Sequence, residues 1–88
     1  MTVQHDPQGG RFFVPLEDGD AELLYASFTD DILDLQHTEV PPSGQGHGVA
    51  DALIRAALTY AREQGLRVVA TCPYVQAWLR RHPEERPT

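Results

Sequence analysis

The first half of the chain contains three short segments, each about as long as a β-strand, in which apolar residues either alternate with polar ones or form the majority. Short turns that contain Asp, Gly or Thr separate these segments. Alternation with a period of two is typical of a half-buried strand, and short turns join antiparallel neighbours. We therefore predict an antiparallel meander of three strands. The strands are expected at residues 12–16, 21–28 and 32–40.

The third strand carries a histidine where its pattern would suit an apolar residue. Strict alternation places Leu33, Leu35 and His37 on one face and the polar residues between them on the other. His37 is therefore a candidate catalytic base. The alternative is a core or edge histidine whose hydrogen bonds are satisfied within the fold, which is the more common case.

The second half changes to a helical period. Apolar residues recur at intervals of three and four over residues 49–64, and Gly65 follows as a natural C-cap. A β-branched run at residues 67–72 then predicts a buried strand. Its crossover from the third strand through the helix predicts parallel pairing. Pro73 suits the first position of a second helix at residues 74–81.

Length and charge narrow the class of protein. A chain of 88 residues suits one domain with one modest core, and the polar ends at residues 1–10 and 84–88 are expected to be flexible. The net charge of −6 argues against nucleic-acid binding. Residues 1–44 hold nine acids and one base, whereas residues 45–88 hold four acids and six arginines. The acidic half could favour a cationic substrate, and the arginine-bearing half a polyanion. An unevenly charged, solvated surface is the simpler interpretation.

The location is inferred from what the sequence lacks. No apolar run approaches the roughly 20 residues that span a bilayer, and the N-terminus has no basic and apolar regions of a secretory signal. A single cysteine rules out an internal disulfide and suits a reducing compartment. We expect a cytoplasmic monomer or weak homodimer that binds neither nucleic acid nor membrane.

A glycine-rich segment, Gln45-Gly46-His47-Gly48-Val49-Ala50, connects the third strand to the first helix. The first N–H groups of a helix have no partner within it, and glycines let a ligand approach the backbone. The segment is therefore either an anion cradle or a helix entry that only needs flexible residues. It fits neither the phosphate-binding P-loop nor the dinucleotide fingerprint G-x-G-x-x-G.

Cys72 is expected where the buried strand ends and the second helix begins, and a helix N-terminus favours the thiolate. It is a candidate nucleophile, or else an ordinary buried cysteine that packs as a small hydrophobe. Tyr74 and Trp78 on the second helix are predicted to anchor the core. The histidines show no i,i+4 pair and no cysteine-rich spacing, so we expect no metal site. The histidines are His5, His37, His47 and His82.

Several elements occur in the order and spacing of one family and cover about half of the chain. Gln45-x-x-Gly48-x-Ala50 has the Q/R-x-x-G-x-G/A form of the acetyl-CoA pyrophosphate loop. The chain resembles the small, single-domain GCN5-related N-acetyltransferase-like proteins. The matching elements are His37-Thr38-Glu39-Val40-Pro41, Gln45-Gly46-His47-Gly48-Val49-Ala50-Asp51-Ala52-Leu53, Ala61-Arg62, Thr71-Cys72-Pro73-Tyr74-Val75 and Arg81-His82-Pro83-Glu84.

The resemblance implies an α+β fold, in which a mixed, mostly antiparallel sheet packs against two helices in a minimal single domain spanning residues 1–88. It implies an acetyl-CoA-dependent N-acetyltransferase that acts on an amine, with Cys72 near the thioester as a candidate nucleophile and His37 as a candidate base. His47 would touch a phosphate or adenine, or else lie in solvent. The residues assigned to coenzyme A are Val40, Gln45, Gly46, His47, Gly48, Val49, Ala50 and Tyr74.

The chain departs from larger relatives of this family in two ways. They usually transfer acetyl directly to an amine, often with a tyrosine as general acid. They also carry extra N-terminal helices and C-terminal strands that commonly build the acceptor site, and this chain lacks them. The alternative function is therefore a module that binds coenzyme A without turnover of its own and is completed by a partner protein.

Overall fold

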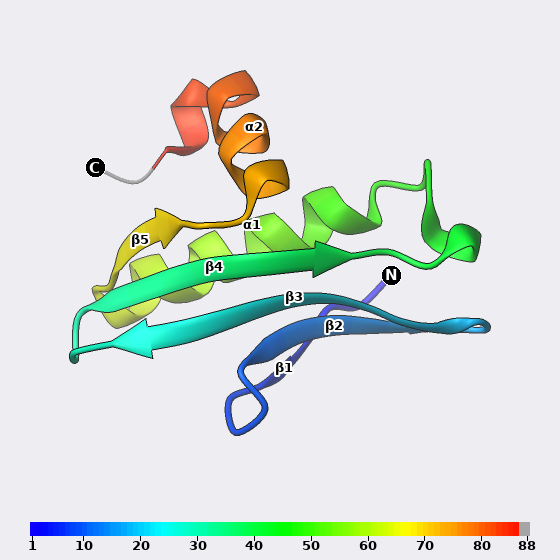
Figure 1. The fold of residues 1–88 in the computed structure, drawn as a ribbon, viewed down its shortest axis with the longest axis horizontal. Coiled ribbons are helices and arrows are strands. Elements are labelled where there is room, and N and C mark those ends of the chain that lie inside the picture. The colour runs from blue at the N-terminus through cyan, green and yellow to red at the C-terminus, as the bar shows by residue number, and fades with distance from the viewer. Residues whose placement is uncertain (87–88) are drawn as a thin grey trace.

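A computed structural model describes residues 1–86 of the chain (Figure 1). Five strands form one sheet in the order β1-β2-β3-β4-β5. The first four are antiparallel neighbours, and β4 and β5 are parallel. The predicted meander and parallel crossover are therefore confirmed. The strands are β1 (Gln4–Asp6), β2 (Arg11–Leu16), β3 (Gly19–Phe28), β4 (Ile32–Glu39) and β5 (Arg67–Ala70).

Two helices follow the bounds that the sequence predicts. Helix α1 runs from Val49 to Gln64, and Gly65 ends it with a left-handed φ of 69° while its N–H bonds the carbonyls of the last turn. Helix α2 runs from Pro73 to Arg81, with Pro73 in its first turn. Short 3₁₀ turns at Pro42–Gly44 and Pro83–Glu85 lie in the loop before α1 and after α2.

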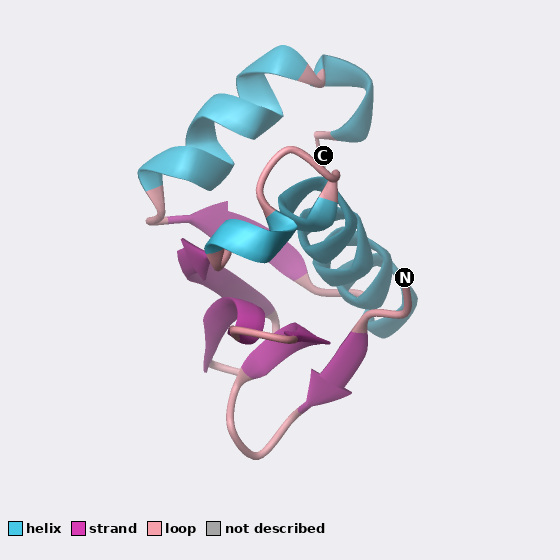
Figure 2. Cartoon of the chain, turned by 90° about the vertical axis from the view of Figure 1, so that its right-hand side faces the viewer, coloured by secondary structure: helices cyan, strands magenta, loops and turns pink. Residues whose placement is uncertain are grey.

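Helix α1 covers one face of the sheet, and α2 lies across the end where β5 stops (Figures 1 and 2). The core is one continuous cluster between α1, α2 and the inward residues of the strands. Its largest fully buried side chains come from both layers. They are Leu23, Leu33, Leu35, Leu53, Ile54, Val75 and Trp78. As predicted, Trp78 is a core anchor.

Both ends of the chain differ from the flexible segments expected from their polarity. Gln4–Asp6 forms strand β1, because His5 stacks on Phe12 at a centroid distance of 4.2 Å and packs edge-on against Tyr60. Near the C-terminus, Glu85 accepts a hydrogen bond from Arg55 of α1 at 2.6 Å. Residues 87–88, also expected to be flexible, lie outside the described residues.

Strand β4 breaks the strict alternation on which the sequence interpretation of His37 depends. Tyr25 pairs with Leu35, but the preceding Leu24 pairs with His37, so Gln36 is an extra residue in a β-bulge. The bulge exchanges the two faces for the rest of the strand. Leu33 and Leu35 are buried as expected, but the placement of His37 beside them is wrong: its side chain is 57% exposed.

Candidate functional site

The two ends of β4 have different neighbours. Residues 32–35 pair with β3 on one side and with β5 on the other, whereas the segment after the bulge pairs only with β3 among the described residues. Strand β5 ends at Ala70, and the chain then turns away into α2. The last part of β4 therefore has one free edge, which faces the start of α1 and the start of α2.

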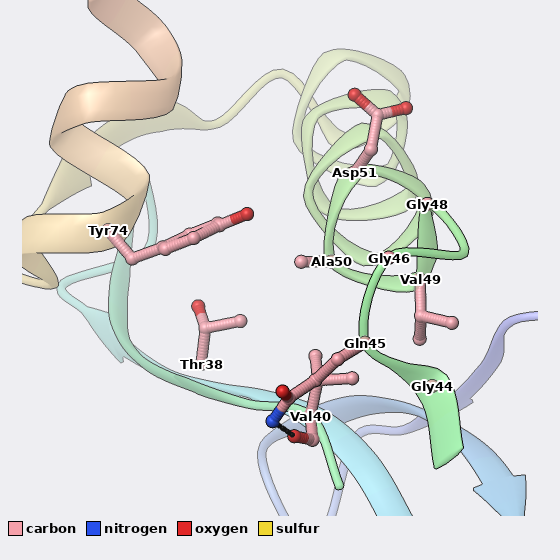
Figure 3. Close-up of a pocket in the computed structure, with 10 residues that line it drawn as sticks. All are labelled: Thr38, Val40, Gly44, Gln45, Gly46, Gly48, Val49, Ala50, Asp51 and Tyr74. Atoms are coloured by element: carbon pink, nitrogen blue, oxygen red, sulfur yellow. Dashed lines mark hydrogen bonds between the residues drawn. The ribbon is translucent and has the colours of Figure 1, made fainter. Parts of the chain in front are cut away.

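A cavity of about 440 Å³ opens at this point, between the end of β4, the loop that follows it and the N-termini of both helices (Figure 3). This volume lies within the range typical of small-molecule sites. Apolar and backbone surface lines most of it, and Asp51 and Tyr74 are the titratable side chains in the lining. The lining residues are Thr38, Val40, Gly44, Gln45, Gly46, Gly48, Val49, Ala50, Asp51 and Tyr74.

The glycines of the loop leave its backbone open toward the cavity. Gly46 and Gly48 have left-handed φ values of 79° and 75°, and a Cβ built on either would meet no atom within 4 Å. Gly48 is the N-cap of α1. The first hydrogen bond of the helix runs from the Ala52 N–H to the Gly48 carbonyl at 3.0 Å. The N–H groups of the first turn before Ala52 are thus available to an anion, which the helix dipole also favours.

Several contacts fix this loop against the sheet. The Gln45 side-chain amide donates to the Val40 carbonyl at 3.1 Å, drawn as the dashed line in Figure 3. Gly44 is buried, and a Cβ there would lie 2.6 Å from Leu16, so this position requires glycine for close packing. Ser43 bonds the Asp18 carboxylate through both its N–H and its hydroxyl, which lowers the pKa of Asp18.

Asp51 places a carboxylate in the first turn of α1, beside the cavity. It accepts hydrogen bonds from the Trp78 indole N–H and from Arg55, both at 3.0 Å. Partial burial acts to raise the pKa of Asp51, but these hydrogen bonds outweigh it, so the pKa lies below its usual range. The carboxylate therefore joins α1 to α2 and stays ionised.

Tyr74 lies on the opposite wall, at the start of α2. Its ring extends across the cavity toward α1, above Thr38 (Figure 3). The side chain is 48% exposed, so its prediction as a core anchor is wrong. Its neighbour one turn later, Trp78, is buried because it packs against α1, whereas Tyr74 faces the open cavity at the start of that helix.

Cys72 is the N-cap of α2 and is buried, with 5% of its surface exposed. Its Sγ lies 3.7 Å from the Thr38 hydroxyl, and Thr38 in turn lines the cavity. The thiol thus contacts a residue of the cavity lining without being part of that lining. It also belongs to the hydrophobic core cluster, as the packing interpretation of this cysteine requires.

The two histidines assigned to the site point elsewhere. Consecutive residues of a strand face opposite sides, so His37 points away from the side on which Thr38 contacts Cys72. The imidazole of His37 lies 3.5 Å from Glu39 in an exposed pair. His47 is exposed and lines a second hollow, formed with residues of β2 and the N-terminus on the other side of the loop. The structure therefore brings neither histidine to the cavity.

Comparison with known proteins places this geometry in a family. A sequence profile described as "GCN5-related N-acetyl-transferase" matches residues 11–87. The chain belongs to this family. Protein NATD1 of Mus musculus is 41% identical over 85 residues, which cover 94% of this chain and 77% of that protein. Protein NATD1 of Danio rerio is 34% identical over the same length.

A solved structure supports the same fold. The NMR solution structure of a GCN5-like protein from Staphylococcus aureus matches with a TM-score of 0.72 over 96% of this chain and 82% of that one. The sequence identity is 23%, so the likeness concerns the fold alone. The predicted GCN5-related N-acetyltransferase fold, a mixed sheet packed by two helices, is confirmed. Family membership supports a general N-acetyltransferase role.

The cavity of this GCN5-related chain includes three residues that sequence reasoning did not assign to it. Thr38 reaches the cavity only because the bulge turns it inward, and the spacing of strand residues gives no sign of a bulge. Gly44 lies just before the predicted glycine-rich segment, in the short 3₁₀ turn at Pro42–Gly44. Asp51 lies just after that segment, in the first turn of α1, where it pairs with Arg55 at i,i+4.

Within residues 1–86, no group of three or more His, Cys, Asp or Glu side chains is arranged to hold a metal ion. Over the same part of the chain, no helix combines the length and the hydropathy needed to cross a membrane.

Proposed function

We propose that this chain is an acetyl-CoA-dependent N-acetyltransferase that binds coenzyme A at the Gln45–Ala50 loop and transfers the acetyl group to an amine. The observation that supports it is the cavity at the free edge of β4, which opens directly onto the loop and the first turn of α1. The thioester of acetyl-CoA would supply the acetyl group.

The residues present suit coenzyme A. Gly46 and Gly48 leave room for a phosphate against the backbone, and the unpaired N–H groups of the first helical turn would bind the pyrophosphate. Val40, which follows β4, and Tyr74 of α2 also line the cavity, and they would contact the chain of amide and methylene groups of the ligand. His47 faces the other side of the loop, so any contact with the ligand would be made from that side.

Two routes for the acetyl group are distinguished by Cys72. In direct transfer, a deprotonated amine attacks the thioester carbonyl, the C–N bond forms, the C–S bond breaks, and the coenzyme A thiolate takes a proton. In the covalent route, the Cys72 thiolate attacks the thioester of acetyl-CoA, which forms acetyl-Cys72 and releases the coenzyme A thiolate. The amine then attacks acetyl-Cys72, the C–N bond forms, and the Cys72 thiolate is released. The covalent route requires the buried thiol to become accessible from the cavity, because Cys72 is 5% exposed and is not among the lining residues.

The proton of the amine needs an acceptor in either route. His37 is the candidate base from sequence, and its exposed position on the opposite side of β4 means that a water molecule must relay the proton. This arrangement predicts a rate that depends weakly on His37. His37→Gln should reduce transfer by less than about tenfold, and a larger loss would assign the histidine direct contact with the acceptor.

A module that binds coenzyme A without turnover is the second candidate function. The observation in its favour is that the titratable side chains of the cavity are Asp51, held by Trp78 and Arg55, and Tyr74. Native mass spectrometry with and without acetyl-CoA, followed by coenzyme A release with a panel of amines, separates the two. Binding without release by any amine would support the module, and absence of binding would exclude both.

The Cys72 route is tested with two variants. Cys72→Ser keeps the size of the side chain but is a far weaker nucleophile at neutral pH, so it should bind coenzyme A and lose any acetyl adduct on the Cys72 peptide. Cys72→Ala reports packing through lost stability, since the thiol is buried. Transfer by Cys72→Ala at the wild-type rate would exclude the covalent route and leave direct attack.

A further inference from the structure

Asp34 is the buried charged residue of the described chain, with only 5% of its surface exposed. It lies on β4 between Leu33 and Leu35, and its side chain therefore points to the face of the sheet opposite α1. A buried carboxylate costs free energy unless its oxygens are hydrogen-bonded. Its partners consequently indicate what the residue stabilises.

The carboxylate of Asp34 binds residues on both sides of the point where β4 and β5 separate. Its Oδ1 accepts from the Thr71 N–H at 3.1 Å and lies 2.8 Å from the Thr71 hydroxyl, which is also 2.9 Å from Oδ2. The Gln36 side-chain amide donates to Oδ2 at 3.1 Å. Thr71 is the first residue after β5, and Gln36 is the bulged residue of β4.

These two partners lie close in sequence to residues that form walls of the cavity. The Thr71 and Cys72 N–H groups both donate to the Leu35 carbonyl at 3.0 Å, and the chain then enters α2. The bulge at Gln36 turns Thr38 toward the cavity. One carboxylate on the far side of the sheet thus holds both the departure of β5 and the bulge of β4.

We propose that Asp34 is a positioning residue that fixes the opening between β4 and α2, and with it the positions of Thr38, Cys72 and Tyr74. Asp34 touches neither the cavity nor its loop. It acts through Thr71, whose hydroxyl and N–H it binds. The assignment of the acyl end of acetyl-CoA to this opening rests on the proposed function. The positioning role of Asp34 does not depend on the proposed function.

The single cysteine of the chain is a direct reporter of this role. Cys72 follows Thr71, is buried, and reacts with a thiol reagent only when the segment around it opens. Removing the Thr71 hydroxyl with Thr71→Val should raise the rate of Cys72 modification by 5,5′-dithiobis-(2-nitrobenzoate) about tenfold. Thr71→Ser keeps the hydroxyl and should stay within about threefold of the wild type.

Two controls separate local positioning from general loss of stability. Leu58→Ala removes buried contacts from α1, and its thiol rate should rise less than that of Thr71→Val when both proteins remain folded. Thr59→Val makes the same chemical change at an exposed position of α1 and should have no effect on the thiol rate. Asp34→Ala also removes the bonds to the Gln36 amide and the Thr71 N–H, so its thiol rate should rise at least as much as that of Thr71→Val. The double variant should add little to Asp34→Ala, because the Thr71 hydroxyl then has no carboxylate to bind.

The outcomes separate this inference from the proposed function. If the thiol rates follow global stability, with Leu58→Ala and Thr71→Val rising in proportion, or if Thr71→Ser behaves like Thr71→Val, the positioning role is overturned. Should Asp34→Ala fail to fold, the Thr71→Val and Thr71→Ser pair still decides. Calorimetry with coenzyme A then tests the consequence for the site: Thr71→Val should bind about tenfold more weakly than wild type. A wild-type protein that binds no coenzyme A would contradict the proposed function and leave the thiol result intact.

Discussion

The space between helix α1 and the sheet is filled differently at the two ends of the helix. Toward its C-terminal end, Tyr60 joins His5, Phe12 and Tyr25 in a cluster of rings whose centroids lie 4.2 to 6.4 Å apart. At its N-terminal end, the strands separate and a cavity of about 440 Å³ remains. The same two layers thus provide dense packing at one end and a binding space at the other.

With the proposed function, the difference predicts which residues carry stability and which carry coenzyme A binding. Aromatic packing removes apolar surface from water and stabilises the fold, whereas the open backbone at Gly46 and Gly48 makes few contacts within the chain. Substitutions in the ring cluster should therefore lower the free energy of unfolding with little effect on coenzyme A. Substitutions at the cavity should do the reverse.

The largest effect is expected for Phe12→Ala. Phe12 is 4% exposed and stacks on His5, so the cavity left behind should lower the free energy of unfolding by about 3 kcal/mol in urea titrations. Coenzyme A affinity of the folded fraction should stay within about twofold. Phe13→Ala is the matched control: Phe13 is half-buried on the opposite face, beneath Arg11, and should cost about 1 kcal/mol. Equal losses would contradict the assignment of stability to the ring cluster.

At the cavity, Gly48→Glu should reduce coenzyme A affinity at least tenfold, about 1.4 kcal/mol. The glutamate would fill the space at the helix N-terminus and bring a negative charge to the proposed pyrophosphate position. Because Gly48 has a φ of 75°, any side chain also strains the backbone, and Gly48→Ala measures that strain alone. A folded Gly48→Glu protein with unchanged affinity in calorimetry would exclude the loop as the binding site.

The sequence predicted the packed regions better than the site. Local patterns identified α1 from Val49 to Gln64, the meander and the parallel β5, because helical period and strand alternation report burial against one neighbouring layer. Strand β1 was missed because its three residues are polar, and its pairing depends on His5 meeting rings from β2, β3 and α1.

Within the site, sequence reasoning found the loop but not the opposite wall. The glycines that open the loop can be identified directly from the sequence. The bulge at Gln36 instead results from the pairing of β3 with β4, and it exchanges the faces on which His37 and Thr38 lie. Tyr74 was taken for a core residue because helical spacing does not show where the neighbouring helix ends. Positions set by long-range pairing are thus the ones that one sequence predicts least well.

A smaller effect is expected for Tyr74→Ala. The ring covers one side of the cavity but is half-exposed, so its loss should weaken coenzyme A binding about threefold, roughly 0.6 kcal/mol, and change stability by less than about 0.5 kcal/mol. Tyr74→Phe keeps the ring and should retain most of the affinity. If Tyr74→Ala lowered stability as Phe12→Ala does, the contrast between the packed and open ends would fail.

The smallest effect concerns pH and the packed end. Burial among the rings lowers the pKa of His5 below its ordinary value of 6.5, and the neighbouring Asp6 offsets this only in part. Because the folded state binds the proton less well than the unfolded state, the stability that His5 contributes is present above pH 6.5 and is lost as the pH falls.

His5→Phe preserves a ring against Phe12 but cannot titrate. Between pH 7 and about 5.5, above the range where carboxylates titrate, the wild type should lose stability relative to His5→Phe in urea titrations. Changes common to both proteins cancel in the difference. If the stability of both proteins changed equally with pH, His5 would bind its proton equally well in the folded and unfolded states. The 2.5 Å hydrogen bond between its Nε2 and the Tyr25 hydroxyl would then persist in the protonated ring.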